Sequence, residues 1–275
     1  MELCFSNIAW DSENELEIAL FLKGAGITNI EVAPGKLFNS IVDVTDREVL
    51  GAKTKWKKLG FDILSMQGLL FNRNDLQVFA SSEAQKNLFN YLVRLMKIAS
   101  SLGVLNLVFG SPMNRCYPTG MPYKKVLSDA VVFFRKIGDA AKSEGVYFCV
   151  EPVSEVHGGN FIQNTEEAIE LVKLIDHSNI RINLDTSTLL MNGENIEQSI
   201  LIATPFIQHF HISAPNLSPV SDQVIPFELI KSMLSKINYK KSISVEMRAR
   251  ESIYQVDDVK RATNDMMKYF DIIQN

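Results

Sequence analysis

Short apolar runs alternate with segments of helical period along the whole sequence, and this alternation constrains the fold more than any other feature. Eight of the runs, rich in β-branched and aromatic residues, are predicted to be strands. They cover residues 3–6, 29–33, 61–67, 105–110, 146–151, 180–185, 207–212 and 242–247. Strands that alternate with amphipathic helices build parallel β-α units, so an α/β protein is predicted.

Eight sequential β-α units can close into a barrel or lie open as a doubly wound sheet. Two features favour closure. The first βα turn contains no GxGxxG or GxxxxGK[ST] phosphate loop, and polar residues follow many strands instead of one switch point. Such barrels take about 250 residues, and no Pro-, Gly- or Ser-rich linker divides the 275 residues present. We therefore predict a single (β/α)8 TIM-barrel domain over residues 1–275.

Composition excludes several classes of protein. The formal net charge of −4 and the pI near 5.7, without a dense basic run, argue against a nucleic-acid partner. The three cysteines, Cys4, Cys116 and Cys149, lie far apart without CxxC spacing, which predicts neither a disulfide framework nor a zinc knuckle. No targeting segment and no apolar stretch of about 18 residues occurs, so a cytoplasmic location without a membrane partner is predicted.

Four successive predicted strands end in a side chain that binds metals, namely Glu151, Asp185, His211 and Glu246. Each alone has a plain structural explanation, as a helix cap or a hydrogen-bonded core histidine. Together they converge above the core of a barrel, where three buried carboxylates would repel one another without a cation. The sequence therefore predicts one divalent metal ion per chain.

The predicted ligand set is rich in oxygen and contains no thiolate. Such a set suits Mn²⁺, Mg²⁺ or Co²⁺ better than a structural zinc site, and it leaves positions open for a substrate. We expect Mn²⁺, with Mg²⁺, Co²⁺ and Zn²⁺ as alternatives.

Five motifs carry a resemblance to a known family: SMQGLLF after the third strand, EP after the fifth, NLDT at the sixth, HFHIS at the seventh and VEM at the eighth. Over nearly its whole length the chain resembles the sugar phosphate isomerase/epimerase family of xylose isomerase-like barrels, and within it the ketose 3-epimerases. The resemblance implies that Glu151 and Glu246 bind the metal and exchange the proton at the substrate carbon, one from each face. Asp185 and His211 would be ligands only, and the protein would be a homodimer or homotetramer.

The chemistry of the predicted site agrees with this resemblance. Removing a proton next to a carbonyl places negative charge on oxygen, which a cation stabilises as an enediolate forms. A carboxylate within hydrogen-bond reach serves as the base. Returning the proton from the opposite face gives epimerisation, and returning it to the adjacent carbon gives aldose–ketose isomerisation. The sequence is compatible with both.

Three positions depart from the epimerase pattern around the substrate. Thr188 stands where the family has a histidine, Leu217 where it often has an arginine, and His157 where it has an acid. Because these changes leave the metal ligands whole, they predict an altered carbohydrate substrate and slow turnover of common free ketohexoses.

Other residues are candidates for contacts with the substrate. Arg248 follows Glu246 by two residues, so its guanidinium either binds substrate or pairs with a carboxylate. Gln67 and Glu31 stand at predicted strand ends, where they can hydrogen-bond hydroxyl groups or tether loops. His209 has apolar neighbours and is expected in the core.

Three other functions compete with the isomerase. A lyase or dehydratase acting on a keto-sugar or keto-inositol uses the same metal and base. A non-catalytic barrel that binds a sugar needs neither. A nuclease of the endonuclease IV type requires many histidines, and the chain has only four together with an acidic pI.

Overall fold

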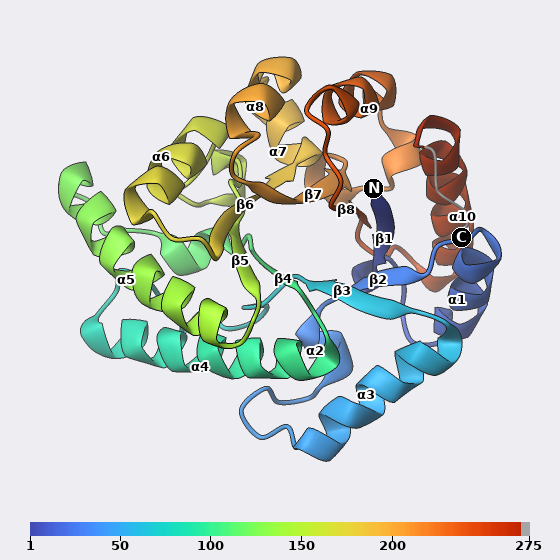
Figure 1. Ribbon diagram of the computed structural model, residues 1–275, viewed down its shortest axis with the longest axis horizontal. Helices are drawn as coiled ribbons and strands as arrows, with labels where there is room; N and C mark the ends of the chain where they lie inside the picture. Colours follow the sequence, from blue (N-terminus) through green and yellow to red (C-terminus); the bar gives the residue numbers. More distant parts are fainter. Residues whose placement is uncertain (271–275) are drawn as a thin grey trace.

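The computed structural model describes residues 1–270, and its strands form a closed, all-parallel barrel (Figure 1). Consecutive strands are neighbours throughout, and β1 pairs with β8 to complete the ring. The strands are β1 (Glu2–Ser6), β2 (Asn29–Val32), β3 (Asp62–Met66), β4 (Asn106–Phe109), β5 (Tyr147–Val150), β6 (Ile180–Asp185), β7 (Ile207–Ser213) and β8 (Ser242–Glu246). The predicted (β/α)8 barrel is confirmed.

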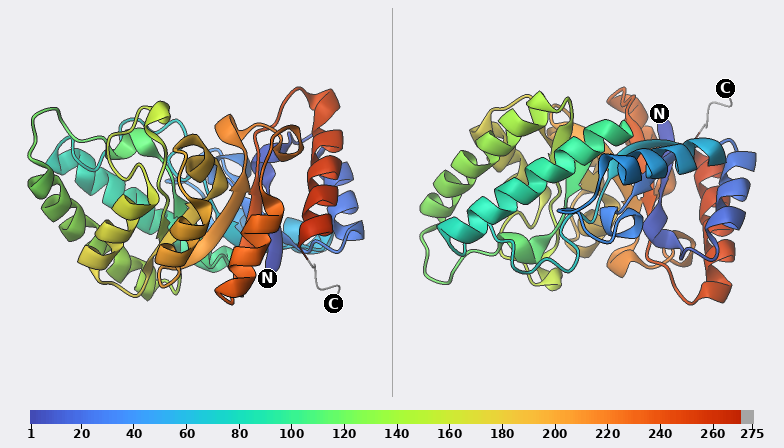
Figure 2. Two further views of the ribbon diagram at one scale, coloured as in Figure 1. Left: turned by 90° about the horizontal axis from the view of Figure 1, so that it is seen from above. Right: turned by 90° about the horizontal axis from the view of Figure 1, so that it is seen from below.

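Helices surround the barrel on its outside, as the face-on view and the two side views show (Figures 1 and 2). The longer ones are α1 (Glu15–Gly24), α3 (Asp46–Leu59), α4 (Ser82–Leu102), α5 (Tyr123–Ser143), α6 (Thr165–Ile175), α8 (Ile196–Ala203), α9 (Phe227–Lys236) and α10 (Ser252–Tyr269). Short helices follow two strands, α2 (Pro34–Leu37) after β2 and α7 (Thr186–Met191) after β6. Single 3₁₀ turns lie at Asn7–Ala9, Pro112–Arg115, Glu155–His157, Pro215–Leu217 and Val220–Asp222.

Local sequence sets where these helices begin and end. At the start of α3, the side chain of Thr45 accepts a hydrogen bond from the Glu48 amide, and the Glu48 carboxylate accepts one from the Thr45 amide. The helix ends at Gly60, whose φ of 98° is accessible to glycine at little cost. These caps fix the ends of the crossover that returns the chain to the next strand.

The apolar core fills the space between the strands and the helices. Every residue of β4, β7 and β8 is buried, as expected for strands covered on both faces. Trp10, Trp56 and Phe134 are among the largest fully buried side chains. Apolar packing between strands and helices therefore stabilises the outside of the barrel, and polar side chains gather inside it at the carboxyl ends of the strands. No helix within residues 1–270 has the length and apolar character that crossing a membrane requires.

Candidate metal centre

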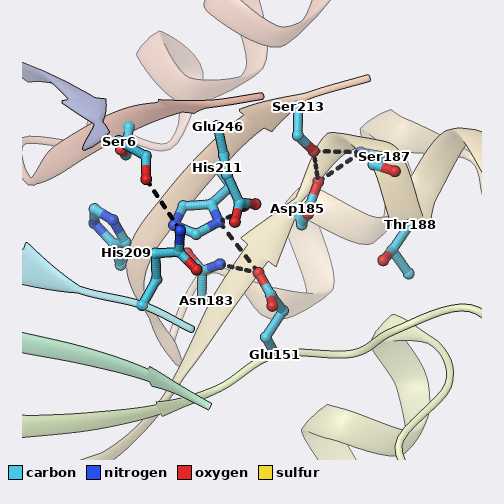
Figure 3. Close-up of polar contacts among 12 residues, drawn as sticks. Ser6, Glu151, Asn183, Asp185, Ser187, Thr188, His209, His211, Ser213 and Glu246 are labelled. Atoms are coloured by element: carbon cyan, nitrogen blue, oxygen red, sulfur yellow. Dashed lines mark hydrogen bonds and ion pairs between the residues drawn. The ribbon is translucent and has the colours of Figure 1, made fainter. Parts of the chain in front are cut away.

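The strands bring the four predicted metal ligands to one end of the barrel (Figure 3). Glu151 directly follows β5, Asp185 ends β6, His211 lies in β7 and Glu246 ends β8. Strand register sets their heights, because Asp185 pairs with His211 and Ser213 pairs with Glu246. One ligand atom from each of the four lies within 4.8 Å of the others, and all four residues are buried. The position of each residue at the end of a predicted strand predicts this convergence.

His211 lies at the centre of the cluster. Its Nδ1 atom is 3.2 Å from Oε1 of Glu151 and 3.2 Å from Oε2 of Glu246. Burial acts to lower the pKa of this imidazole, but the carboxylates of Glu31 and Glu246 outweigh that effect and hold the pKa well above 6.5. The imidazole of His211 thus lies between two carboxylates whose negative charge a cation could balance.

Asp185 shows how costly the clustered negative charge is. Burial, reinforced by the nearby carboxylates of Glu151 and Glu246, raises the pKa of Asp185 to about 8. Its Oδ1 atom accepts hydrogen bonds from the hydroxyl of Ser213 and, at 2.6 Å, from the amide of Ser187. Burial also raises the pKa of Glu246. A divalent cation fits this set of donors, since it would neutralise several buried oxygen ligands at once.

A second buried group lies beneath His211. Oε2 of Glu31 is 3.2 Å from Nε2 of His211 and 2.9 Å from Nε2 of His209, while Oε1 accepts a 3.0 Å hydrogen bond from Ser244. Glu31 is wholly inaccessible to solvent. The expectation that it would hydrogen-bond substrate hydroxyls is therefore wrong: it lies in the interior of the barrel and orients the imidazole of His211. His209 is in the core, as expected.

Glu151 is held by residues that sequence reasoning missed. Nδ2 of Asn183 donates a 2.5 Å hydrogen bond to Oε1 of Glu151, and Arg115 Nη2 donates to the backbone carbonyl of Glu151 at 2.7 Å. Gly110, one residue after β4, leaves the space that the carboxylate occupies, since a Cβ there would lie 1.8 Å from Oε2 of Glu151. One signal was available for Asn183, which precedes Asp185 by two residues and so shares its face of β6.

A cavity of about 420 Å³ opens above the cluster. Glu151, Asp185 and Glu246 line it, together with four of the predicted substrate-binding residues, Gln67, His157, Thr188 and Arg248. Two of those four side chains already make internal hydrogen bonds. Gln67 Nε2 donates to the Ser6 hydroxyl at 3.0 Å, and the Thr188 hydroxyl donates to the Pro152 carbonyl at 3.0 Å.

Residues 20–270 match the family described as the xylose isomerase-like TIM barrel, so the chain belongs to this family and the resemblance seen in the sequence is confirmed. The chain is 29% identical over 113 residues to D-psicose 3-epimerase from Ruminiclostridium cellulolyticum, a stretch covering 41% of this chain and 38% of that one. It is 27% identical over 111 residues to the enzyme of the same name from Agrobacterium fabrum, covering 40% of this chain and 38% of the relative.

Solved structures are similar over nearly the whole length. A D-psicose 3-epimerase from Clostridium cellulolyticum H10, crystallised with D-tagatose, superimposes with a TM-score of 0.80 at 19% identity, covering 98% of this chain and 99% of that one. A 3-keto-D-glucoside 4-epimerase from E. coli gives a TM-score of 0.77 at 16% identity, covering 96% and 99%. At these identities the similarity shows the shared fold.

Proposed function

We propose that the protein is a divalent-metal-dependent sugar epimerase or isomerase. One observation carries the proposal: three carboxylates and an imidazole from four strands converge within 4.8 Å at the base of a cavity at the carboxyl ends of the strands. In barrels of this type the active site lies at that end. The sequence similarity to two D-psicose 3-epimerases supports the same class of reaction. We also infer that the chain forms one domain, of which the structure describes residues 1–270.

Glu151, Asp185, His211 and Glu246 would hold the metal, for which we propose Mn²⁺. When bound, a divalent cation stabilises the negative charge that develops on a substrate oxygen during removal of a neighbouring carbon-bound proton. The ligand chemistry suits this ion, because hard carboxylate oxygens predominate and no thiol contributes. His211 would bind through Nδ1, since its Nε2 faces Glu31.

Glu151 and Glu246 would move the proton. Both line the cavity, and they come from β5 and β8, three strands apart around the ring. One carboxylate removes the proton beside the carbonyl and the other returns it on the opposite face, which inverts the carbon. If the proton returns instead to the neighbouring carbon, the product is the isomeric aldose or ketose. Asn183 fixes Oε1 of Glu151, leaving Oε2 beside Gly110 at the cavity wall.

The test is metal content together with proton exchange. Wild type, Glu246→Gln and His211→Ala would be purified, supplied with Mn²⁺ and assayed by elemental analysis, with Glu197→Gln on the exposed surface of α8 as a matched control. We expect about one metal per chain in wild type and the control, and less in the two variants.

Deuterium uptake from heavy water into ketoses would then fall by about 10²- to 10⁴-fold in Glu246→Gln. Analysis of the products separates epimers and aldose–ketose pairs from the dehydrated products of a lyase. A wild-type protein that stays metal-free after Mn²⁺ is supplied would overturn the proposal and favour a non-catalytic sugar-binding barrel.

A further inference from the structure

The charges around the cavity are unevenly distributed. Its acidic side chains, Glu151, Asp185 and Glu246, all belong to the proposed metal centre at its base. The remaining polar side chains on its wall are neutral or basic: Gln67, Ser111, His157, Ser187, Thr188, Asn216 and Arg248. A ligand extending from the base toward the rim therefore meets a cationic side chain and no further carboxylate.

Arg248 is the permanent cation on this wall, and its guanidinium has no ion-pair or hydrogen-bond partner within residues 1–270. Its neighbour Arg250 differs, because Nε and Nη2 of Arg250 both bind the carboxylate of Asp258. The sequence left two roles open for Arg248, binding substrate or pairing with a carboxylate. Over the described residues no carboxylate pairs with it, so its five N–H donors are available to a ligand.

Asn216 lies beside Arg248 at the rim. The amide of Arg248 donates a 2.7 Å hydrogen bond to the carbonyl of Leu217, which ties the end of β8 to the turn after β7. Asn216 has a left-handed backbone (φ 60°), lines the cavity, and its side-chain amide makes no hydrogen bond within the described part of the chain. Two unused donors, one from each of the last two βα loops, thus face the same cavity.

We propose that the substrate carries an acidic group, a phosphate ester or a carboxylate, which Arg248 binds together with Asn216. This inference rests on the proposed function, because it names the substrate class of the same site. A guanidinium presents paired N–H groups that match two oxygens of a phosphate or carboxylate. The loops after the seventh and eighth strands are also where TIM barrels often bind phosphate.

The apolar side chain of Leu217 agrees with this assignment. Leu217 cannot donate a hydrogen bond to a hydroxyl group, and Thr188 already donates its hydroxyl proton to Pro152. Neither of these two side chains therefore donates to a ligand, whereas within residues 1–270 the guanidinium of Arg248 is free to bind an oxyanion. The positive charge of Arg248 at the rim would thus select acidic substrates over neutral sugars.

The experiment compares Arg248→Gln with wild type and with Arg47→Gln, a matched loss of charge on the exposed side of α3. Each Mn²⁺-loaded protein would be tested with fructose, fructose 6-phosphate and fructuronate. Deuterium uptake gives kcat/KM, and calorimetry measures binding. We expect wild type to favour one of the two acidic ketoses over fructose, and the preferred one identifies the acidic group.

Arg248→Gln should lower kcat/KM and affinity for that acidic ketose by about 10- to 100-fold. It should leave kcat/KM for fructose nearly unchanged, and Arg47→Gln should leave kcat/KM unchanged for both substrates. Equal activity on fructose and the acidic ketoses, or an equal loss for all three in Arg248→Gln, would overturn the inference and leave the proposed function standing. Binding of an acidic ketose that depends on Arg248, without deuterium uptake, would support the inference and refute the proposed catalysis. Absence of both binding and uptake would refute both.

Discussion

Replacing Gly110 by alanine should damage the proposed metal centre while leaving the barrel folded. The new Cβ would lie 1.8 Å from Oε2 of Glu151, and ordinary contact begins at 3.4 Å, so the carboxylate must retreat by about 1.6 Å. Glu151 cannot move freely, because Oε1 is hydrogen-bonded to Asn183 and lies 3.2 Å from Nδ1 of His211. The displaced atom is the end of a side chain, so we expect the variant to fold.

A misplacement of about 1 Å at a reacting group can cost about 10²-fold in rate. We therefore expect Gly110→Ala to lose about 100-fold in sugar proton exchange and at least about 10-fold in Mn²⁺ affinity. In the presence of a chelator, its free energy of unfolding should fall by about 1–3 kcal/mol, as for other overpacked sites. Calorimetric metal titration and urea unfolding measure these quantities.

Gly51→Ala is the matched control, since Gly51 lies within α3 and nothing lies within 4 Å of a Cβ added there. It should stabilise the helix by about 0.5–1 kcal/mol and leave Mn²⁺ affinity unchanged. If Gly110→Ala binds Mn²⁺ as tightly as wild type and exchanges protons at the same rate, then Glu151 does not act where the geometry places it, and its assignment as ligand and base fails.

Three further outcomes are expected. Glu31→Gln removes the carboxylate that faces Nε2 of His211 and should weaken Mn²⁺ binding by about 10- to 100-fold in a calorimetric titration; unchanged affinity would contradict the role of Glu31 in orienting this imidazole. Arg115→Lys replaces a buried guanidinium that donates to four backbone carbonyls. Urea unfolding should show a free energy of unfolding lower by about 3 kcal/mol. A loss below about 0.5 kcal/mol would show that lysine satisfies the same carbonyls. Without metal, the native state retains a proton on Asp185, whose pKa is about 8. The stability that this proton contributes is full below the unfolded pKa and is lost as pH rises through 8. Asp185 alone should therefore lower the free energy of unfolding in chelator by about 1 kcal/mol between pH 7 and pH 8. The raised pKa of His211 acts in the same direction, and a flat profile over that interval would contradict the clustered charges.

The barrel could be predicted from the sequence because strand and helix periods alternate without interruption. Each predicted strand begins and ends within one residue of the observed one; for example, the strand expected over 105–110 is Asn106–Phe109. The convergence of Glu151, Asp185, His211 and Glu246 followed from the same pattern. Parallel strands in a closed ring end on one rim, so position along the strand is enough to bring these residues together.

How deep each polar side chain lies inside the barrel could not be predicted from its position along the strand. Glu31 was expected near a strand end, either reaching substrate hydroxyls or tethering a loop, but it pairs with Ser6 inside the ladder and is wholly buried. A break in the register of β2 against β3 lies between Ile30 and Glu31. Such a break depends on the packing of both strands and leaves no local sequence signal.

Gly110 and Arg115 were missed for a related reason. Each acts on Glu151 across the gap between neighbouring strands and loops, Gly110 by leaving space and Arg115 by binding a backbone carbonyl. A glycine after a strand and an arginine in a loop are common in any sequence. Their roles become visible only from distances in three dimensions.

The proposed metal ligands and the residues proposed to contact the substrate lie on different kinds of structure, so one set can be kept while the other changes. The ligands lie in or directly after strands, where the ladder fixes their register and a shift of one residue would turn them away from the interior. His157 and Leu217 lie in 3₁₀ turns, and Arg248 follows the end of β8. Loops of this kind tolerate substitution without disturbing the barrel. Changes at these loop positions can therefore alter which substrate is bound while the carboxylates that would move the proton stay in place.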